Sequence, residues 1–162
     1  IMTKTGHSYI KSEISKSNAI LGGEMSGHIF YNDNWYGFDD GIFAALKLLE
    51  ILSSKESTTH EVFNKFTQLF NTPEIKIAVE DEEKFEIVEQ LKVKLKPEGY
   101  DSILIDGLRL ENKDCWGLVR ASNTTPSLIL RFEANTEQKL MEIQELFQKT
   151  LLEINKNLKF LN

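Results

Sequence analysis

Apolar side chains in the second part of the chain recur at intervals that distinguish helices from strands. From Leu140 to Leu158 they follow one another at three or four positions, which predicts a helix that begins near Thr136. The segment from Phe85 to Leu95 has helical spacing and stops before Pro97, so it predicts an amphipathic helix.

Four other stretches combine short apolar runs or alternating polarity with turn residues at their ends, which is typical of strands. They cover residues 74–79, 102–110 with a turn at Asp106-Gly107, 116–120 and 127–132. Helices and strands in this order favour an antiparallel sheet with helices on one face. We therefore expect residues 55–162 to form an α+β module.

Residues 1–54 give weaker signals, and no first element is evident before residue 19. Ala19 to Leu21 and Ile29 to Tyr31 predict two short strands, the first of them buried, joined by a glycine-rich turn. From Gly41 to Leu52 apolar residues cover nearly every face, so we expect a buried helix capped by Asp39 and Asp40. These pieces look like the second half of an α/β domain.

A polar stretch from Ser53 to Thr59 marks the boundary between two parts, taken as residues 1–54 and 55–162. Thr58 and Glu61 have the spacing of a capping box, which predicts a helix from there to Phe70. The chain starts with Ile1 and shows no signal segment, so we expect it to be a piece of a longer protein.

Composition and charge exclude some classes of function. The chain of 162 residues has 19 basic and 25 acidic side chains, a net charge of −6, which argues against a nucleic-acid binder. Its longest apolar run is too short to span a membrane. Cys115 is the single cysteine and cannot form an internal disulfide, so we expect a reducing compartment, the cytoplasm.

The loop from Arg120 to Pro126 lies between two predicted strands and combines one guanidinium with a run of hydroxyl and amide side chains. A phosphate dianion needs a charge-assisted donor and short neutral donors of this kind. The same residue types also form ordinary turns. Spacing alone favours neither interpretation.

A second candidate is the turn from Gly22 to His28, in which Glu24 and Ser26 could exchange hydrogen bonds with sugar hydroxyls. Taken alone, it is better explained as a glycine-rich connection with exposed polar residues. His7 and His28 have no cysteine or aspartate at ligand spacing, so no metal site is expected, and Asp39-Asp40 fits a helix cap better than a Mg²⁺ site. Cys115 is expected to be a small core residue.

Five motifs occur in one order along the chain, spread from Lys4 to Pro126, with a variable stretch between about Ser53 and Pro97. They are Lys4–Ser8, Gly23–His28, Gly37–Gly41, Asp106–Arg109 and Trp116–Pro126. Together they resemble the carboxy-terminal part of the α-D-phosphohexomutases, and specifically the bacterial phosphomannomutase/phosphoglucomutase branch.

The resemblance implies a four-domain enzyme that moves a phosphoryl group between positions 1 and 6 of a hexose phosphate through a bisphosphorylated intermediate. Residues 1–54 would be the end of the third, sugar-binding domain, and residues 55–162 the fourth domain, which in this family is TBP-like. Two sets of residues would then contact the substrate. Sugar contacts would come from Glu24, Ser26, His28 and His7, and contacts to the non-reacting phosphate from Arg120, Ser122, Asn123 and Thr124.

Two details of the motifs bear on the substrate. The phosphoglucosamine mutase branch has Gln where this chain has Met25, and a different phosphate loop from Ser122-Asn123-Thr124. Mannose and glucose phosphates are therefore favoured over glucosamine phosphate, which stays open as an alternative. Another alternative is a non-catalytic phosphosugar-binding or interaction module.

The family's phosphoserine loop and its Mg²⁺ loop belong to earlier domains and have no counterpart in these 162 residues. Catalysis of phosphoryl transfer depends on a positioned nucleophile and on the charge of the metal. The resemblance thus implies that the chain alone is inactive, that its partners are the remaining domains of the longer chain, and that Mg²⁺ binds outside it.

Overall fold

The computed structural model describes residues 1–160. It divides the chain into two compact units, residues 1–67 and residues 68 onward, which are called here the N-terminal and C-terminal units. The boundary between the units therefore follows α3 (Thr59–Phe63), whereas the boundary predicted from the sequence, after residue 54, precedes that helix. The capping box of α3 is confirmed, because Thr58 and Glu61 bond to each other's backbone N–H groups.

The C-terminal unit is built on a six-stranded sheet in which every pair of strands is antiparallel. Its order is β3-β8-β7-β6-β5, and β4 pairs with β8 beside β3. The strands are β3 (Phe70–Asn71), β4 (Ile75–Ala78), β5 (Asp101–Ile103), β6 (Leu108–Glu111), β7 (Cys115–Ala121) and β8 (Ser127–Ala134). The predicted strands and the α+β class are confirmed.

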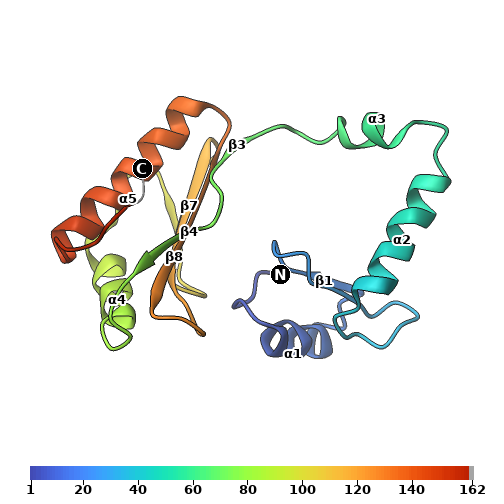
Figure 1. Cartoon of the computed structure of the whole chain (residues 1–162), viewed down its shortest axis with the longest axis horizontal. Helices are drawn as coiled ribbons and strands as arrows, with labels where there is room; N and C mark the ends of the chain where they lie inside the picture. Colours follow the sequence, from blue (N-terminus) through green and yellow to red (C-terminus); the bar gives the residue numbers. More distant parts are fainter. Residues whose placement is uncertain (161–162) are drawn as a thin grey trace. The chain divides into compact units, whose positions relative to one another are not determined.

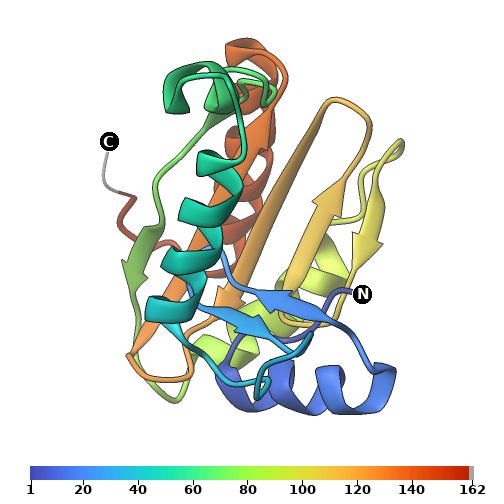
Figure 2. The same cartoon turned by 90° about the vertical axis from the view of Figure 1, so that its right-hand side faces the viewer.

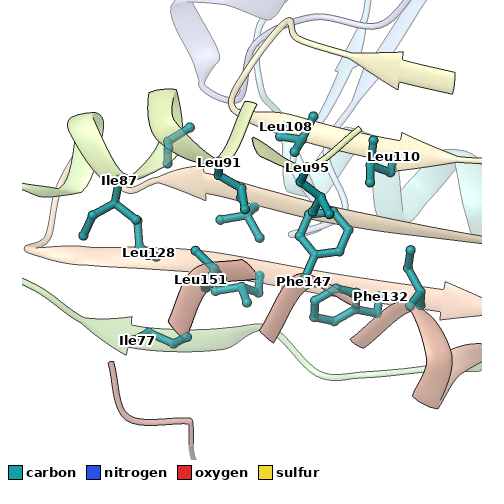
Figure 3. Packing of buried hydrophobic residues seen from close by; sticks show 14 of the residues in the cluster. Ile77, Ile87, Leu91, Leu95, Leu108, Leu110, Leu128, Phe132, Phe147 and Leu151 are labelled. Carbon is teal, nitrogen blue, oxygen red and sulfur yellow. The ribbon is translucent and has the colours of Figure 1, made fainter. Parts of the chain in front are cut away.

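Two helices, α4 (Lys84–Lys94) and α5 (Glu137–Ile154), pack on one face of this sheet (Figure 1). Residues in β7 alternate between buried and partly exposed, because successive side chains point to opposite faces of a sheet. The inward row meets the apolar face of each helix, and the result is one continuous core (Figure 3). Fully buried members include Leu91, Leu108, Leu128, Val119, Ile143 and Phe147.

The N-terminal unit contains α1 (His7–Ser17), a hairpin of β1 (Leu21–Gly23) and β2 (Ile29–Tyr31), then α2 (Gly41–Ser53) and α3. Helix α1 packs against β1 and α2 packs against β2 (Figure 2). Its core is small and consists of Ile10, Ile14 and Phe30. Helix α1 was not predicted, because only two apolar residues of this polar helix face the hairpin.

Three predictions about this part of the chain are wrong in detail. Strand β1 includes both glycines of the expected turn, and its Leu21 is exposed rather than buried. The expected burial of α2 is not observed: none of its residues is buried, although a helix that is apolar on nearly every face is usually buried. Helix α3 ends at Phe63, and Phe70 belongs to β3 instead of a continued helix.

Within residues 1–160, none of the helices combines the length and the apolar character required to cross a bilayer.

Candidate functional site

The turn between β1 and β2 is closed by two backbone hydrogen bonds. The N–H of Glu24 donates to the carbonyl of His28 at 2.9 Å, and the N–H of Gly27 donates to the carbonyl of Glu24 at 3.0 Å. Gly27 has φ of +91°, a conformation that glycine adopts without strain. The polar residues of this turn are therefore presented on a defined backbone.

Both carboxylate oxygens of Glu24 are engaged. Oε1 accepts a hydrogen bond from the N–H of Gly6 at 2.9 Å, and Oε2 accepts one from the hydroxyl of Ser26 at 3.1 Å. The carboxylate thus holds the residue before α1 next to the turn. Each oxygen has further lone pairs, so Glu24 can still accept hydrogen bonds from a ligand.

His28 and His7 meet at one carboxylate. Nδ1 of His28 lies 2.6 Å from Oδ2 of Asp39, and Nε2 of His7 lies 3.4 Å from the same oxygen. The two imidazole rings are in edge contact, with centroids 4.6 Å apart. The sequence shows no aspartate at ligand spacing from these histidines, but the folded chain brings Asp39, eleven residues after His28, into contact with both.

Asp39 and Asp40 have different roles, although both were predicted to cap the helix that follows them. Asp40 is the N-cap of α2, where Oδ1 accepts from the N–H of Phe43 at 2.9 Å, as predicted. Asp39 instead forms a β-bridge with Phe30, and its Oδ1 accepts from the N–H of Ile29 at 3.3 Å. That bond fixes the carboxylate so that Oδ2 faces the two histidines.

Residues 122–126 form the loop that joins β7 to β8, so Arg120 of the predicted segment lies in β7 itself, and Ser122 organises the loop. The Ser122 hydroxyl oxygen accepts from the N–H groups of Thr124 and Thr125 at 3.3 and 3.1 Å, and from the Thr125 hydroxyl at 2.8 Å. Ser122 is only 5% exposed. Its side chain therefore shapes the loop from within, whereas the neighbouring Asn123 and Thr124 are exposed.

The side chains of Asn123 and Thr124 form no hydrogen bond with any of residues 1–160. The Arg120 guanidinium likewise has no hydrogen bond or ion pair in that part of the chain. Unused donors at the end of β7 and in the loop that follows it are suited to an anion with several acceptor oxygens.

The three arginines of the chain lie on the sheet face opposite α4 and α5. Arg109 of β6 and Arg131 of β8 both pair with Leu118 of β7. Arg120 follows Leu118 by two residues in β7, so its side chain points to the same face. Arg109 is already occupied, since its Nε lies 2.6 Å from the Glu111 carboxylate and its guanidinium stacks on Trp116. Arg120 lies one residue before the end of β7, next to the loop, and lacks such partners.

Arg131 is a candidate that the sequence analysis missed. Its Nε is buried and has no hydrogen-bond partner within residues 1–160, which is unusual for a buried donor. The pairing of β7 with β8 places it on the same face as Arg120 and diagonal to it. Only the register of that hairpin shows this, because the two arginines are eleven residues apart in sequence.

Other candidates have structural explanations. Cys115 is buried in the core, as expected, and lies 3.6 Å from the Tyr100 hydroxyl. His60 is exposed on α3, where it contacts Asn64. Neither belongs to the groups described above.

Comparisons with known proteins match both units in the order of the chain. The family model for phosphoglucomutase/phosphomannomutase, alpha/beta/alpha domain III, matches residues 1–70, and the model for the C-terminal domain of the same proteins matches residues 74–149. The chain belongs to the phosphoglucomutase/phosphomannomutase family. The resemblance inferred from the five motifs is thereby confirmed.

Individual relatives agree with this assignment. The chain is 49% identical over 154 residues to a phosphomannomutase/phosphoglucomutase of Pseudomonas syringae, covering 95% of this chain and 33% of the relative. It is 49% identical over 160 residues to a phosphoglucomutase of Neisseria meningitidis, covering 98% and 34%. The chain thus spans about a third of the length of the curated relatives that it matches.

A solved structure supports the fold as well. A phosphoglucomutase/phosphomannomutase family protein from Burkholderia thailandensis matches with a TM-score of 0.89 and 38% identity, covering 99% of this chain and 34% of that one.

Proposed function

We propose that this chain provides substrate-recognition residues of a phosphohexomutase, an intramolecular phosphotransferase that interconverts hexose 1-phosphates and 6-phosphates. The observation that carries the proposal lies at the end of β7 and in the loop after it, where Arg120, Asn123 and Thr124 have donors unused by the rest of residues 1–160. These donors would hold the non-reacting phosphate. Ser122 would act mainly by shaping the loop, since its hydroxyl oxygen already accepts three hydrogen bonds.

The turn between β1 and β2 would contact the sugar. Glu24 accepts hydrogen bonds from two sides and retains acceptor capacity, as the recognition of sugar hydroxyls requires. Ser26 is exposed and lies next to it. His28 and His7 complete this group, and mannose and glucose phosphates are the preferred substrates in the proposal.

Mg²⁺, which the family resemblance implies, does not fit the donors of this chain. Among residues 1–160, the cluster of His7, His28 and Asp39 is the one set of three potential ligands close enough to share an ion. Mg²⁺ prefers oxygen ligands in octahedral geometry, whereas this cluster offers two imidazole nitrogens. We propose that Mg²⁺ binds elsewhere in the longer enzyme, that the chain alone has no mutase activity, and that the enzyme works in the cytoplasm.

The proposal is tested by calorimetric titration of the chain with mannose 6-phosphate, glucose 6-phosphate, glucosamine 6-phosphate and inorganic phosphate. Arg120→Gln should weaken binding by roughly ten- to a hundredfold, because a hydrogen bond to a charged group contributes about 1.5–3 kcal/mol. Arg109→Gln is the matched control, since Arg109 lies on the same sheet face but is paired with Glu111. Equal losses in both variants would contradict the loop assignment.

The sugar contacts need a separate variant. Ser26→Ala should weaken binding of mannose 6-phosphate and leave binding of inorganic phosphate unchanged, because Ser26 is assigned to the sugar alone. Stronger binding of glucosamine 6-phosphate than of mannose 6-phosphate would favour the phosphoglucosamine branch instead. Interconversion of mannose 1-phosphate and mannose 6-phosphate by the purified chain would overturn the predicted inactivity.

A further inference from the structure

Three segments of the N-terminal unit bring metal-ligating side chains to one place. His7 is the first residue of α1, His28 directly precedes β2, and Asp39 is bridged to β2 just before α2. One donor atom of each residue lies within 4.8 Å of the donor atoms of the other two. We propose that His7, His28 and Asp39 bind a divalent transition-metal ion, for which Zn²⁺ is the best match.

The donor set determines the class of metal. Two imidazole nitrogens and one carboxylate oxygen are typical ligands of Zn²⁺, Co²⁺ and Ni²⁺, whereas Mg²⁺ and Ca²⁺ prefer oxygen. Zinc accepts three protein ligands with water in the fourth position. The proposed site is thus distinct in chemistry from a magnesium site.

The spacing of the donors agrees with such a site after a small adjustment. With bonds of about 2.0–2.1 Å in tetrahedral geometry, two ligand atoms lie roughly 3.3 Å apart. Nε2 of His7 is 3.4 Å from Oδ2 of Asp39, which meets this requirement. Nδ1 of His28 is 2.6 Å from the same oxygen, a hydrogen-bond distance, so this pair must separate by several tenths of an ångström.

Metal binding also requires a lone pair on Nδ1 of His28. An ionised carboxylate can only accept, so Nδ1 carries the proton of the bond to Asp39 when no metal is bound. On metal binding that proton moves to Nε2, which leaves a neutral imidazole with Nδ1 free to coordinate. Protons are conserved, and no further reactant is needed.

The surroundings hold these side chains while leaving them accessible. The N–H of Ile29 fixes the other oxygen of Asp39, and the ring of buried Phe30 lies edge-on against His7 at 5.6 Å. The side chains of His7 and His28 are 53% and 44% exposed. An ion from solvent can therefore reach the cluster without any rearrangement of the fold.

One consequence of the site rests on the proposed function. If His7 and His28 also contact the sugar, the metal and a hexose phosphate compete for the same side chains. Metal binding itself does not depend on that role.

The site is tested by NMR of the imidazole groups during titration of the chain with ZnCl₂. The chain has three histidines, so His60 serves as an internal control, because it lies on α3 outside the cluster. Signals of His7 and His28 should shift together and saturate at one ion per chain. Unchanged signals of His7 and His28, or a response of His60 alone, would overturn the proposal.

Variants identify the ligands by calorimetry with the same ion. His7→Ala and Asp39→Asn should each weaken Zn²⁺ binding by about tenfold or more, and His60→Ala should leave it unchanged. His7→Ala is decisive if Asp39→Asn does not fold, since His7 is exposed and does not belong to the small core of Ile10, Ile14 and Phe30. Zn²⁺ affinity in His7→Ala equal to that of the unmodified chain would count against the site.

A final titration separates the two proposals. Saturating mannose 6-phosphate should weaken Zn²⁺ binding if the histidines contact the sugar. Zn²⁺ binding that is unaffected by bound mannose 6-phosphate would contradict the proposed competition between metal and sugar, but it would not contradict the metal site. Failure of every phosphosugar to bind would contradict the proposed function, whereas the metal site would still be judged by the histidine signals.

Discussion

Gly107 lies directly against the backbone of Val119 on the neighbouring strand. A Cβ at Gly107 would be 2.1 Å from the Val119 carbonyl oxygen and 2.7 Å from Cα of Arg120, and the φ of Gly107 is +83°. No side chain fits there without displacing β7. This contact fixes the end of β7 from which the proposed phosphate loop begins.

Gly107→Ala should therefore destabilise the C-terminal unit by more than about 2 kcal/mol, because backbone strain and a steric clash add. Gly99→Ala is the matched control: its φ is +80°, but nothing lies within 4 Å of the added Cβ. Chemical denaturation of both variants separates the cost of backbone strain from the cost of the steric clash. Equal losses of stability would mean that the close approach to Val119 contributes nothing.

Ser122 and Thr124 should respond differently to replacement by alanine. Ser122→Ala removes the acceptor for three hydrogen bonds in a buried position, so we expect a loss of about 1–3 kcal/mol in the free energy of unfolding as well as weaker phosphate binding. Thr124→Ala removes an exposed hydroxyl and should weaken phosphate binding at unchanged stability. Denaturation and titration with inorganic phosphate check both; a stable Ser122→Ala would contradict the organising role.

Asp39 should fix the tautomer of His28. Because the carboxylate accepts from Nδ1 at 2.6 Å, neutral His28 should carry its proton on Nδ1 and leave Nε2 to face a ligand as an acceptor. In Asp39→Asn the amide can present either a donor or an acceptor, so the preference should weaken. Nitrogen chemical shifts of the imidazole measure the tautomer, and a proton on Nε2 in the unmodified chain would contradict the assignment.

Tyr100 should make the C-terminal unit sensitive to high pH. Burial, and secondarily the hydrogen bond with the Cys115 thiol, raise the pKa of the Tyr100 phenol above its ordinary value. The unfolded chain then loses this proton first, so the contribution to stability is present below pH 10 and is lost as pH rises through the pKa of the folded state. Tyr100→Phe should lose less stability between about pH 9 and 11 in urea denaturation; parallel curves would rule out the linkage.

The sequence predicted the elements of the C-terminal unit well, because their apolar faces are covered within that unit. In α5 the spacing of Ile143, Phe147 and Leu151 matched a helical face, and all three are fully buried. Helix α1 escaped detection because its contact with the hairpin needs only Ile10 and Ile14.

The sequence identified the segments that contain the candidate sites, but not which of their side chains lie close together in the folded chain. Loop and turn composition pointed to Arg120 and Glu24, whereas the approach of Asp39 to His28 depends on a bridge to β2 that no local pattern encodes. Arg131 depends in the same way on the register of β7 with β8. Pairings across strands decide which polar side chains meet, and a single sequence gives no direct measure of them.

The exposed apolar surface of α2 leads to a last prediction. Ile42, Leu46 and Leu49 are 78, 58 and 60% exposed, and contiguous apolar surface of this kind favours association. The chain should therefore bind a hydrophobic dye such as anilinonaphthalene sulfonate and self-associate with rising concentration.

Replacing Leu46 and Leu49 together by Lys should reduce both effects without lowering stability, because no residue of α2 is buried. Val93→Lys on α4 is the control, since Val93 is also exposed, at 71%, but lies outside α2. Dye fluorescence and sedimentation velocity provide the measurements. A loss of stability in the double variant would show instead that α2 packs against other apolar groups in solution, and an equal effect of Val93→Lys would remove α2 as the cause.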